Sequence, residues 1–231
     1  ETLRTRSVVL ATGASARTLG VPGEDELMGY GLSTCATCDG AFHRGHDVVV
    51  VGGGDAAMEE ALFLTKFADS VTVLHRREEL RASEILARRA ADSDDITFRW
   101  NAEIDEIHGS RDEGVTGVTI VTHPDGYPTR RRRNGESVDS ARLDVQGVFY
   151  GIGHDPNTGF LEDTPIELDE SGYVRTEPGT TATTVAGVFA AGDVADSRYQ
   201  QAITAAGTGA MAALDAERSL DDRARERELL A

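Results

Sequence analysis

The chain has 231 residues, of which 39% are hydrophobic, so it is long enough to bury one large core or two small ones. Its 40 acidic residues outnumber 23 basic ones, and a net charge of −17 argues against binding to nucleic acid or to an anionic membrane surface. No apolar run approaches the roughly 20 residues that span a bilayer, and no targeting sequence is visible, so we expect a cytoplasmic protein. Because the chain begins with Glu1 and its first recognisable element starts at Arg6, we also expect a fragment of a longer protein.

The basic residues are almost all arginine, since Lys66 is the only lysine. A surface rich in carboxylates and poor in lysine stays hydrated at high salt, where its self-repulsion is screened, and this predicts a halophilic protein. A GC-rich genome that favours arginine over lysine is the alternative. It explains the lysine count but not the excess of acidic residues.

The first half of the chain alternates short apolar runs with segments of helical periodicity. A β-branched run over Ser7–Ala11 predicts a buried strand that ends in a turn at Thr12 and Gly13, and residues 14–34 have the composition of a loop. A strand–helix–strand–helix order is then predicted over Asp47–Val51, Asp55–Phe67, Val71–Leu74 and Glu78–Ala91. Together these segments have the length of a parallel crossover unit.

The second half begins with a different pattern. From Ile96 to Gln146 the chain has short alternating strands with turn signals at Asp125-Gly126 and Asn134-Gly135, which predicts an antiparallel meander. The run Arg130–Arg133 lies between those turns, so we expect it at the solvated tip of a hairpin. The remaining predicted elements are a strand over Gly147–Gly153, a strand over Gly187–Ala191 and a helix from about Gln201 to Leu220.

A glycine-rich motif joins the first predicted strand–helix pair. Gly52-Gly53-Gly54-Asp55-Ala56-Ala57 fits the pattern G-x-G-x-x-A in the strand–turn–helix context that a dinucleotide site requires. Gly52 permits the tight turn, Gly54 lets the backbone approach a pyrophosphate, and Ala57 lets helix and strand pack closely. The helix that starts at Asp55 adds N–H donors and the positive end of its dipole. A tight turn without a ligand is the alternative.

The end of the second strand indicates which nucleotide is bound. A site for NAD carries Asp or Glu there, whereas this chain has His75, Arg76 and Arg77, with Arg81 one helical turn further. Guanidinium groups grip a 2′-phosphate that an acid would repel, so the motif predicts NADPH. A solvated helix start is the alternative for Arg76 and Arg77. Cations are disfavoured at a helix N-terminus, which favours an anion between them.

Cys35 and Cys38 are the only cysteines, and they lie three residues apart. On the first turn of a helix this spacing brings the two sulfurs within bonding reach, and it predicts a small, reducible disulfide with a stabilised thiolate. Asp39 adjoins the second cysteine and is a candidate for proton transfer when a thiolate leaves or forms. Because nicotinamide does not readily reduce a disulfide directly, an intermediary such as flavin is expected.

Three other interpretations of the cysteine pair stay open. A zinc site could combine the pair with His43 and His46, although the gap of four residues between Cys38 and His43 is shorter than in zinc fingers, and we expect no metal. The pair could also be a static structural disulfide. It could be two inert core cysteines, although Thr37 and Asp39 are poor core residues.

Five separated motifs occur in one order over nearly the whole chain. They are Ala11-Thr12-Gly13-Ala14, Cys35–Gly40, Gly52–Ala57 with His75–Ala82, Gly153–Thr158, and Gly187–Val194 with Gln201–Arg218. This ordered set resembles the low-molecular-weight, NADPH-dependent thioredoxin reductases. The resemblance implies an α/β fold of two Rossmann-like dinucleotide-binding domains with an antiparallel meander.

The resemblance also implies a domain division. It assigns residues 1–14 and 151–231 to an FAD-binding domain and residues 15–150 to an NADPH-binding domain that carries the Cys-x-x-Cys motif. The family's N-terminal segment of about 100 residues, with the first glycine motif for FAD, is not in the chain. The FAD domain is therefore expected to be incomplete, and the chain alone is expected to bind FAD poorly.

The resemblance further implies which residues hold FAD. Ala190–Asp193 resembles the FAD fingerprint, in which Gly192 lies at the cofactor and Asp193 hydrogen-bonds the ribityl chain; an N-cap or turn role is the alternative for Asp193. Gln201 and Ala202 would open a helix whose N-terminus faces the flavin. The further positions that the resemblance places at a cofactor are Thr12, Gly13 and Gly153.

In the mechanism that the resemblance implies, NADPH reduces FAD, and FAD reduces the Cys35–Cys38 disulfide. Cys38 would face the flavin, Cys35 would attack thioredoxin, and Asp39 would be the acid–base partner. A homodimer is expected. Two departures are Gln200, where the family commonly has Arg, and Ala41, which replaces one of two aromatics and leaves Phe42 for contact with thioredoxin.

Two other functions compete with this one. A related flavin reductase would serve another acceptor, such as a peroxiredoxin. A non-catalytic redox sensor that binds NADPH would need no flavin segment, and the expected absence of that segment is its main support.

Overall fold

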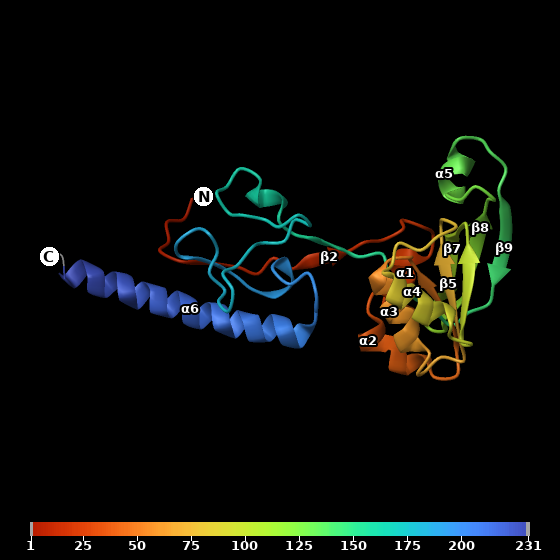
Figure 1. The fold of residues 1–231 in the computed structure, drawn as a ribbon, viewed down its shortest axis with the longest axis horizontal. Coiled ribbons are helices and arrows are strands. Elements are labelled where there is room, and N and C mark those ends of the chain that lie inside the picture. Colours follow the sequence, from red (N-terminus) through yellow and green to blue (C-terminus); the bar gives the residue numbers. More distant parts are fainter. Residues whose placement is uncertain (1, 230–231) are drawn as a thin grey trace. The chain divides into compact units, whose positions relative to one another are not determined.

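The computed structural model describes the backbone of residues 2–229 and the side chains as far as residue 222. The chain divides into two compact units (Figure 1). The central unit is Arg17–Gly153, and the split unit combines Glu1–Ala16 with His154–Ala231. In the described residues no helix is long and apolar enough to cross a membrane.

A parallel sheet of five strands forms the middle of the central unit, in the order β3-β10-β4-β5-β6. Its strands are β3 (Leu32–Ser33), β4 (Asp47–Val51), β5 (Ser70–His75), β6 (Ile96–Trp100) and β10 (Gly147–Tyr150). The helices that connect β4 to β5 and β5 to β6 are α3 (Asp55–Leu64) and α4 (Glu84–Ala91). The predicted strand–helix–strand unit is confirmed, and the fold is the expected α/β type.

The valine run of β4 is buried on both faces of this sheet, so its residues alternate between two cores. Val48 and Val50 pack with apolar side chains of α3. Val49 and Val51 pack with those of a second, antiparallel sheet, which Figure 1 shows on the other side. That sheet has the order β7-β8-β9, with β7 (Ala102–Ser110), β8 (Gly114–Thr122) and β9 (Asp139–Leu143). The predicted meander is therefore one outer layer, and helices are the other.

Two predictions are wrong, one for the segment before β4 and one for the segment after β5. Residues 14–34 hold regular elements, namely β2 (Ala14–Ala16), α1 (Glu24–Leu27) and β3. These elements are too short to leave a periodic pattern, and α1 is fixed by tertiary contacts, since the buried carboxylate of Glu24 accepts from the hydroxyl of Tyr150 at 2.9 Å. The helix expected from Glu78 begins only at Glu84, because the backbone before it bonds to the glycine turn described below.

One prediction for the meander is wrong at its edge. β6 does not belong to it but pairs in parallel with β5, from Val71 with Ile96 onward. The run Arg130–Arg133 lies in the connection between the antiparallel neighbours β8 and β9 and is mostly exposed, as expected for a hairpin tip, but it also forms most of a short helix, α5 (Pro128–Arg133). Pro128 is suited to the first helical turn, and Gly135, at a φ of 84°, follows the helix end.

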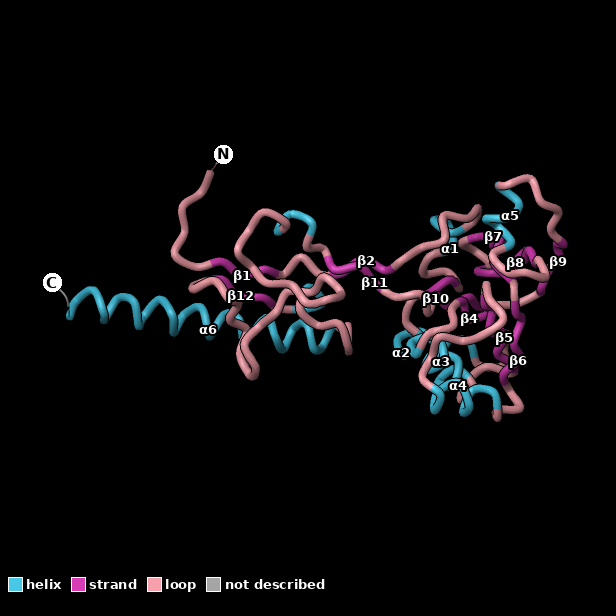
Figure 2. The backbone as a smooth tube through the Cα atoms, turned by 45° about the horizontal axis from the view of Figure 1, so that its top comes forward, coloured by secondary structure: helices cyan, strands magenta, loops and turns pink. Residues whose placement is uncertain are grey.

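The split unit combines two strand pairs with a long helix. β1 (Val8–Leu10) pairs in parallel with β12 (Val188–Ala190), and β2 pairs antiparallel with β11 (His154–Pro156); Figure 2 shows both pairs. The predicted C-terminal helix is confirmed as α6 (Ala202–Leu229), and Ala212 packs it against Phe189 of β12. The short helices that remain are α2 (Ala36–Asp39), η1 (Gly40–His43), η2 (Gly159–Leu161) and η3 (Gly192–Val194).

Candidate nucleotide and redox sites

The glycine turn follows β4 at the point where its two neighbours, β5 and β10, also end. Gly52 has a φ of 146°, and a Cβ there would lie 2.5 Å from the carbonyl oxygen of Gly151 and 2.7 Å from the Cβ of Ala57. Ala57 is fully buried, and a Cβ on Gly151 would lie 2.6 Å from its Cα. The small residues therefore bring the start of α3 against two strands, in the crevice where α/β sheets bind nucleotides.

The other two glycines of the turn face different surroundings. A Cβ on Gly53 would lie 2.3 Å from the ring of His75, so this position is closed by the protein itself. A Cβ on Gly54 would meet nothing within 4 Å. The space expected for a ligand therefore lies at Gly54, and the need for glycine at Gly53 was not foreseen from the motif.

His75 lies beneath the turn rather than at its rim. It is 4% exposed, and its Nε2 is 3.0 Å from the carbonyl oxygen of Glu79. Burial lowers the pKa of the His75 imidazole, with the nearby arginines acting in the same direction. The ring therefore supports the turn at Gly53, and the place of His75 in the predicted cofactor site stays a prediction.

The loop after β5 is tied back to the glycine turn. The backbone N–H groups of Arg81 and Ala82 donate to the carbonyl oxygen of Gly53 at 2.7 and 3.1 Å. The N–H of Ser83 donates to the carboxylate of Asp55 at 2.5 Å. These bonds keep the loop out of α4 and bring its arginines beside the turn. The argument that placed Arg76 and Arg77 at a helix N-terminus is wrong, because they lie in this loop.

The loop and the turn fit a phosphorylated dinucleotide. Arg76 and Arg81 are exposed, whereas Nε of Arg77 is shielded from solvent and has no hydrogen-bond acceptor among the described residues. Such a donor calls for an acceptor, and a phosphate oxygen suits it. Open space at Gly54 and guanidinium groups nearby are the features that NADPH requires.

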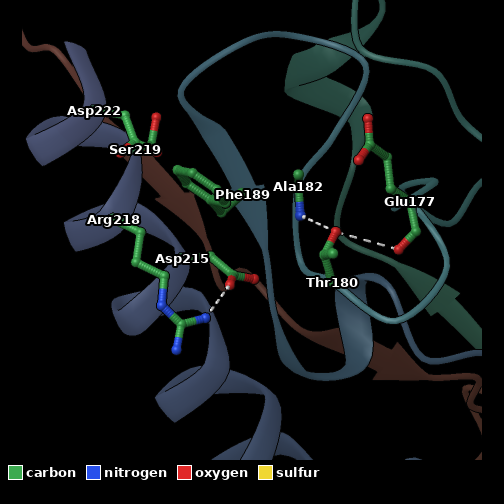
Figure 3. A pocket seen from close by; sticks show the side chains of 8 residues that line it. All are labelled: Glu177, Thr180, Ala182, Phe189, Asp215, Arg218, Ser219 and Asp222. Carbon is green, nitrogen blue, oxygen red and sulfur yellow. Dashed lines mark hydrogen bonds and ion pairs between the residues drawn. The ribbon is translucent and has the colours of Figure 1, made fainter.

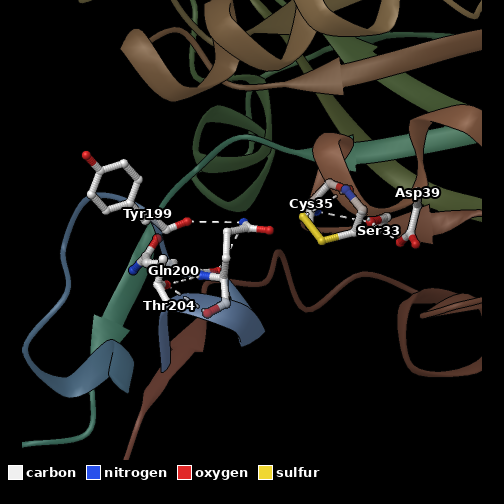
Figure 4. Close-up of a disulfide and its surroundings, with 8 residues drawn as sticks. Ser33, Cys35, Asp39, Tyr199, Gln200 and Thr204 are labelled. Carbon is white, nitrogen blue, oxygen red and sulfur yellow. Dashed lines mark hydrogen bonds between the residues drawn. A yellow bond between two sulfur atoms is a disulfide. The ribbon is translucent and has the colours of Figure 1, made fainter. Parts of the chain in front are cut away.

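The redox pair forms the predicted disulfide, Cys35–Cys38, on the first turn of α2 (Figure 4). Cys35 is the N-cap residue of this helix. The backbone N–H of Cys38 lies 3.1 Å from Sγ of Cys35 and 3.1 Å from its carbonyl oxygen. The sulfur of Cys35 thus accepts from a helix N-terminus, the setting that stabilises a thiolate.

Ser33 links the disulfide to Asp39, and sequence analysis missed it. Its hydroxyl donates to Oδ2 of Asp39 at 2.6 Å and accepts from the N–H of Cys35 at 3.0 Å (Figure 4). Ser33 is buried on β3. A serine two residues before the first cysteine was the available signal, since such side chains often bond to nearby backbone.

The zinc interpretation fails on geometry. The two sulfurs are bonded to each other, and His43 packs edge-on against Phe149, with its ring where a Cβ on Gly147 would lie. Burial lowers the pKa of His43. Among the described residues, no group of three or more His, Cys, Asp or Glu side chains is arranged to hold a metal ion.

Glu60 is a second carboxylic acid near the redox helix that the sequence did not single out. It lies on α3, and the backbone N–H of Ala36, the first residue of α2, donates to its carboxylate. Its Oε2 is shielded from solvent and has no donor among the described residues. Burial raises the pKa of Glu60 to about 7, against an ordinary value of 4.5.

In the split unit, the first and fourth sequence motifs bond to each other. The hydroxyl of Thr12 donates to the carbonyl oxygen of Asn157, and the Asn157 amide donates to the carbonyl oxygen of Thr12, both at 2.9 Å. The N–H of Asn157 donates to the carbonyl oxygen of Gly13 at 2.9 Å. The structure thus places Thr12 and Gly13 beside β11, while Gly153, with a φ of 92°, ends the central unit.

The fingerprint Gly192–Asp193 lies on η3, next to α6. The N–H of Gly192 donates to the hydroxyl of Thr208 at 2.9 Å. Oδ1 of Asp193 is shielded and has no donor among the described residues, and burial and Asp196 raise the pKa of this carboxyl group. A hydroxyl donor is the partner that Asp193 lacks, so the position fits the ribityl chain of FAD.

The start of α6 is built around a second aspartate. The carboxylate of Asp196 accepts from the backbone N–H groups of Tyr199 and Gln200 at 2.9 and 3.2 Å. Gln200 has a φ of 49°, and the N–H of Gln201 donates to the hydroxyl of Thr204 at 3.3 Å, in the group that Figure 4 draws. The helix begins at Ala202, as expected from Gln201-Ala202.

A hollow of about 410 Å³ lies between α6 and the end of β12 (Figure 3). Asp215 on its wall accepts from the N–H and hydroxyl of Thr181 at 3.0 and 2.8 Å, and Arg218 lies 3.8 Å from the same carboxylate. Its polar groups are therefore used to attach a loop to α6, and the hollow holds none of the predicted site residues.

A nucleotide-type turn and a reducible disulfide in one α/β unit define the class of protein. Residues 1–209 match the family model of the pyridine nucleotide-disulphide oxidoreductases, and the chain belongs to this family.

The similar proteins within this family are named as thioredoxin reductases. The chain is 53% identical over 223 residues to the thioredoxin reductase of Mycolicibacterium smegmatis. This match covers 96% of this chain and 67% of that protein. It is 49% identical to the bifunctional thioredoxin reductase/thioredoxin of Mycobacterium leprae, over 97% of this chain and 46% of that protein. The crystal structure of thioredoxin reductase from Streptococcus pyogenes superimposes with a TM-score of 0.82 at 40% identity, over 94% of this chain and 66% of that chain.

These matches confirm the resemblance drawn from the five motifs. The chain spans about two thirds of the length of the Mycolicibacterium and Streptococcus reductases and less than half of the bifunctional protein.

Proposed function

We propose that the protein is a thioredoxin-disulfide reductase that takes electrons from NADPH and passes them through FAD and the Cys35–Cys38 disulfide to thioredoxin. The observation that carries this proposal is the disulfide itself, closed on the first turn of α2 in the unit that also holds the glycine turn. Bound FAD would supply the two-electron chemistry that links a nicotinamide to a disulfide.

The contacts around the disulfide support distinct roles for its two sulfurs. When the bond opens, Sγ of Cys35 keeps the N–H of Cys38 as a donor, so negative charge at Cys35 is stabilised. Cys35 is therefore the proposed nucleophile toward thioredoxin, and Cys38 the proposed flavin-side sulfur. Asp39, held by Ser33, is the proposed proton carrier.

The cofactor sites follow the two units. The proposed NADPH-binding residues of the central unit are Gly52, Gly54, Asp55, Ala57, Arg76, Arg77 and Arg81, with His75 supporting the turn. The proposed FAD-binding residues are Thr12, Gly13, Gly153, Gly192, Asp193, Gln201 and Ala202. In this proposal the split unit is part of an FAD-binding domain.

Thioredoxin is the proposed acceptor, and the name of the Mycobacterium leprae relative supports it, since that protein carries a thioredoxin together with the reductase. A homodimer and a cytoplasmic location are proposed on the resemblance to the family. Adaptation to high salt is proposed from the excess of 40 acidic over 23 basic residues.

The test is the reduction of thioredoxin by the full-length protein with NADPH and FAD. We expect a Cys35→Ser variant to lose this activity, while bound FAD is still reduced by NADPH, because the substitution removes only the sulfur that meets the acceptor. Thr37→Ala is the matched control, since Thr37 is exposed between the two cysteines. A Cys35→Ser variant that still reduces thioredoxin would refute the roles, and a wild-type protein that reduces only a peroxiredoxin would refute the acceptor.

A further inference from the structure

One aromatic ring lies against both arginines that follow β5. The guanidinium carbons of Arg76 and Arg77 are 5.3 and 5.4 Å from the centre of the Tyr127 ring. Both distances fall within the reach of cation–π attraction, about 6 Å. Two adjacent arginines repel each other and have many rotamers, so a shared ring restricts where their charges lie.

The backbone of this ring is tied to the same loop. The N–H of Tyr127 donates to the carbonyl oxygen of Arg76 at 2.9 Å, and the N–H of Asn101 donates to that of Arg77 at 3.3 Å. Gly126 packs so closely that a Cβ there would lie 2.7 Å from the carbonyl oxygen of Arg76. The arginine loop is therefore held from two other segments, β6–β7 and β8–α5.

Both anchoring residues have a backbone conformation that is uncommon outside glycine. Tyr127 has a φ of 50° and Asn101 a φ of 54°. A left-handed tyrosine costs free energy, which the surrounding structure must offset. Such conformations gather at functional sites because they aim a side chain where regular backbone would not.

Helix α5 holds the turn that carries Tyr127. Nε of Arg131 donates to the carbonyl oxygen of Gly126 at 2.9 Å, and its Nη1 donates to Glu136 at 2.8 Å. The N–H of Arg131 also donates to the carbonyl oxygen of Tyr127. Part of the arginine run that was expected to be solvated thus fixes the turn.

We propose that Tyr127 is a positioning residue for the 2′-phosphate of NADPH, because its ring holds the guanidinium groups of Arg76 and Arg77 together beside the glycine turn. The inference rests on the proposed NADPH site and adds to it a residue from the meander. In this arrangement Nε of Arg77 is shielded from solvent and has no acceptor among the described residues, so it is free to donate a hydrogen bond to a phosphate oxygen.

The test compares two ligands that differ by one phosphate. Adenosine 2′,5′-bisphosphate and adenosine 5′-monophosphate are titrated into the full-length protein by calorimetry. Tyr127→Asn removes the ring but keeps a residue that tolerates left-handed backbone. We expect it to weaken the bisphosphate about tenfold, as the loss of two cation–π contacts predicts, and to leave the monophosphate unchanged.

Tyr127→Phe is the matched control, because it keeps the ring, and it should bind the bisphosphate like the wild type. Tyr127→Gly is a second ring-removing variant, because glycine adopts left-handed backbone freely, and it keeps the test decisive if Tyr127→Asn does not fold. Equal losses for both ligands, or a preference for the bisphosphate that survives both ring-removing variants, would overturn the role of Tyr127. A wild-type chain that binds the two ligands equally would instead overturn the NADPH site itself.

Discussion

The carboxyl group of Glu60 lies near α2 in surroundings that oppose its charge. Its Oε2 is shielded, and the anion is stabilised by the backbone N–H of Ala36. Burial therefore raises its pKa to about 7. At neutral pH the carboxyl group is therefore present both protonated and ionised, and it is hydrogen-bonded to the first residue of the helix that carries the disulfide.

We predict that Glu60 makes the fold less stable as pH rises. The folded protein keeps the proton up to about pH 7, whereas the unfolded chain releases it near 4.5, so stability falls across that window and is constant above it. Glu60→Gln should remove this dependence and raise the free energy of unfolding at pH 8 by up to about 3 kcal/mol.

Urea unfolding of both proteins at pH 5 and pH 8 measures this difference. Glu59→Gln is the control, because it removes the same charge from an exposed position on the same helix. Equal responses from the two variants would show that net charge, and not burial of Glu60, sets the pH dependence.

At the scale of elements, the turn after β4 needs glycine for two different reasons, one at Gly53 and one at Gly54. Gly53 faces the ring of His75, while Gly54 faces open space. We predict that Gly53→Ala destabilises the fold by about 2 kcal/mol, because its Cβ overlaps a buried ring. Gly54→Ala should keep wild-type stability, since its Cβ meets no protein atom, but it should weaken NADPH binding at least tenfold by filling the space of the pyrophosphate.

Thermal unfolding and calorimetric titration with NADPH, done on both variants, give the two readouts. Each variant serves as the control for the other. A stable Gly53→Ala protein would contradict the packing that we describe at His75, and a Gly54→Ala protein with full affinity would contradict the position of the ligand.

Elements with a strong local pattern were predictable from the sequence. The valine run of β4 and the periodic α3 are long enough to define themselves, and the glycine motif between them fixes the turn. The start of α4 was not predictable, because the bonds from Arg81 and Ala82 to Gly53 join segments that the sequence separates. The same holds for β6, whose parallel pairing depends on β5 and not on its own residues.

The candidate site was predictable to the extent that its residues carry their own chemistry. The Cys-x-x-Cys pair and the arginines after β5 are recognisable as residue types at a spacing. Tyr127 was not, because a tyrosine has no special chemistry until a fold places it against Arg76. The spacing of Ser33 from Cys35 indicated a bond to nearby backbone, but not the bond to Asp39. The support that His75 gives to the turn was not readable from the sequence either, since only its burial places the ring under Gly53.

For the whole molecule, net charge is the property with the widest effect. A charge of −17 on 231 residues opposes compaction in dilute buffer, where the Debye length at 0.01 M salt is about 30 Å and repulsion reaches across a domain. Salt also weakens favourable ion pairs. Exposed ion pairs, such as Arg88 with Glu84 on α4, contribute at most about 1 kcal/mol each. Screening of the general repulsion should therefore exceed the loss of these pairs.

We predict that the midpoint of thermal unfolding rises steadily with KCl from 0.01 M to about 1 M, where the Debye length falls to about 3 Å. Sucrose at matched osmolality is the control, because it favours the compact state without screening charge. A rise with KCl that exceeds the rise with sucrose would support adaptation to high salt. If the midpoint in dilute buffer already equals that at 1 M KCl, the acidic residues do not limit stability, and the halophile proposal is wrong.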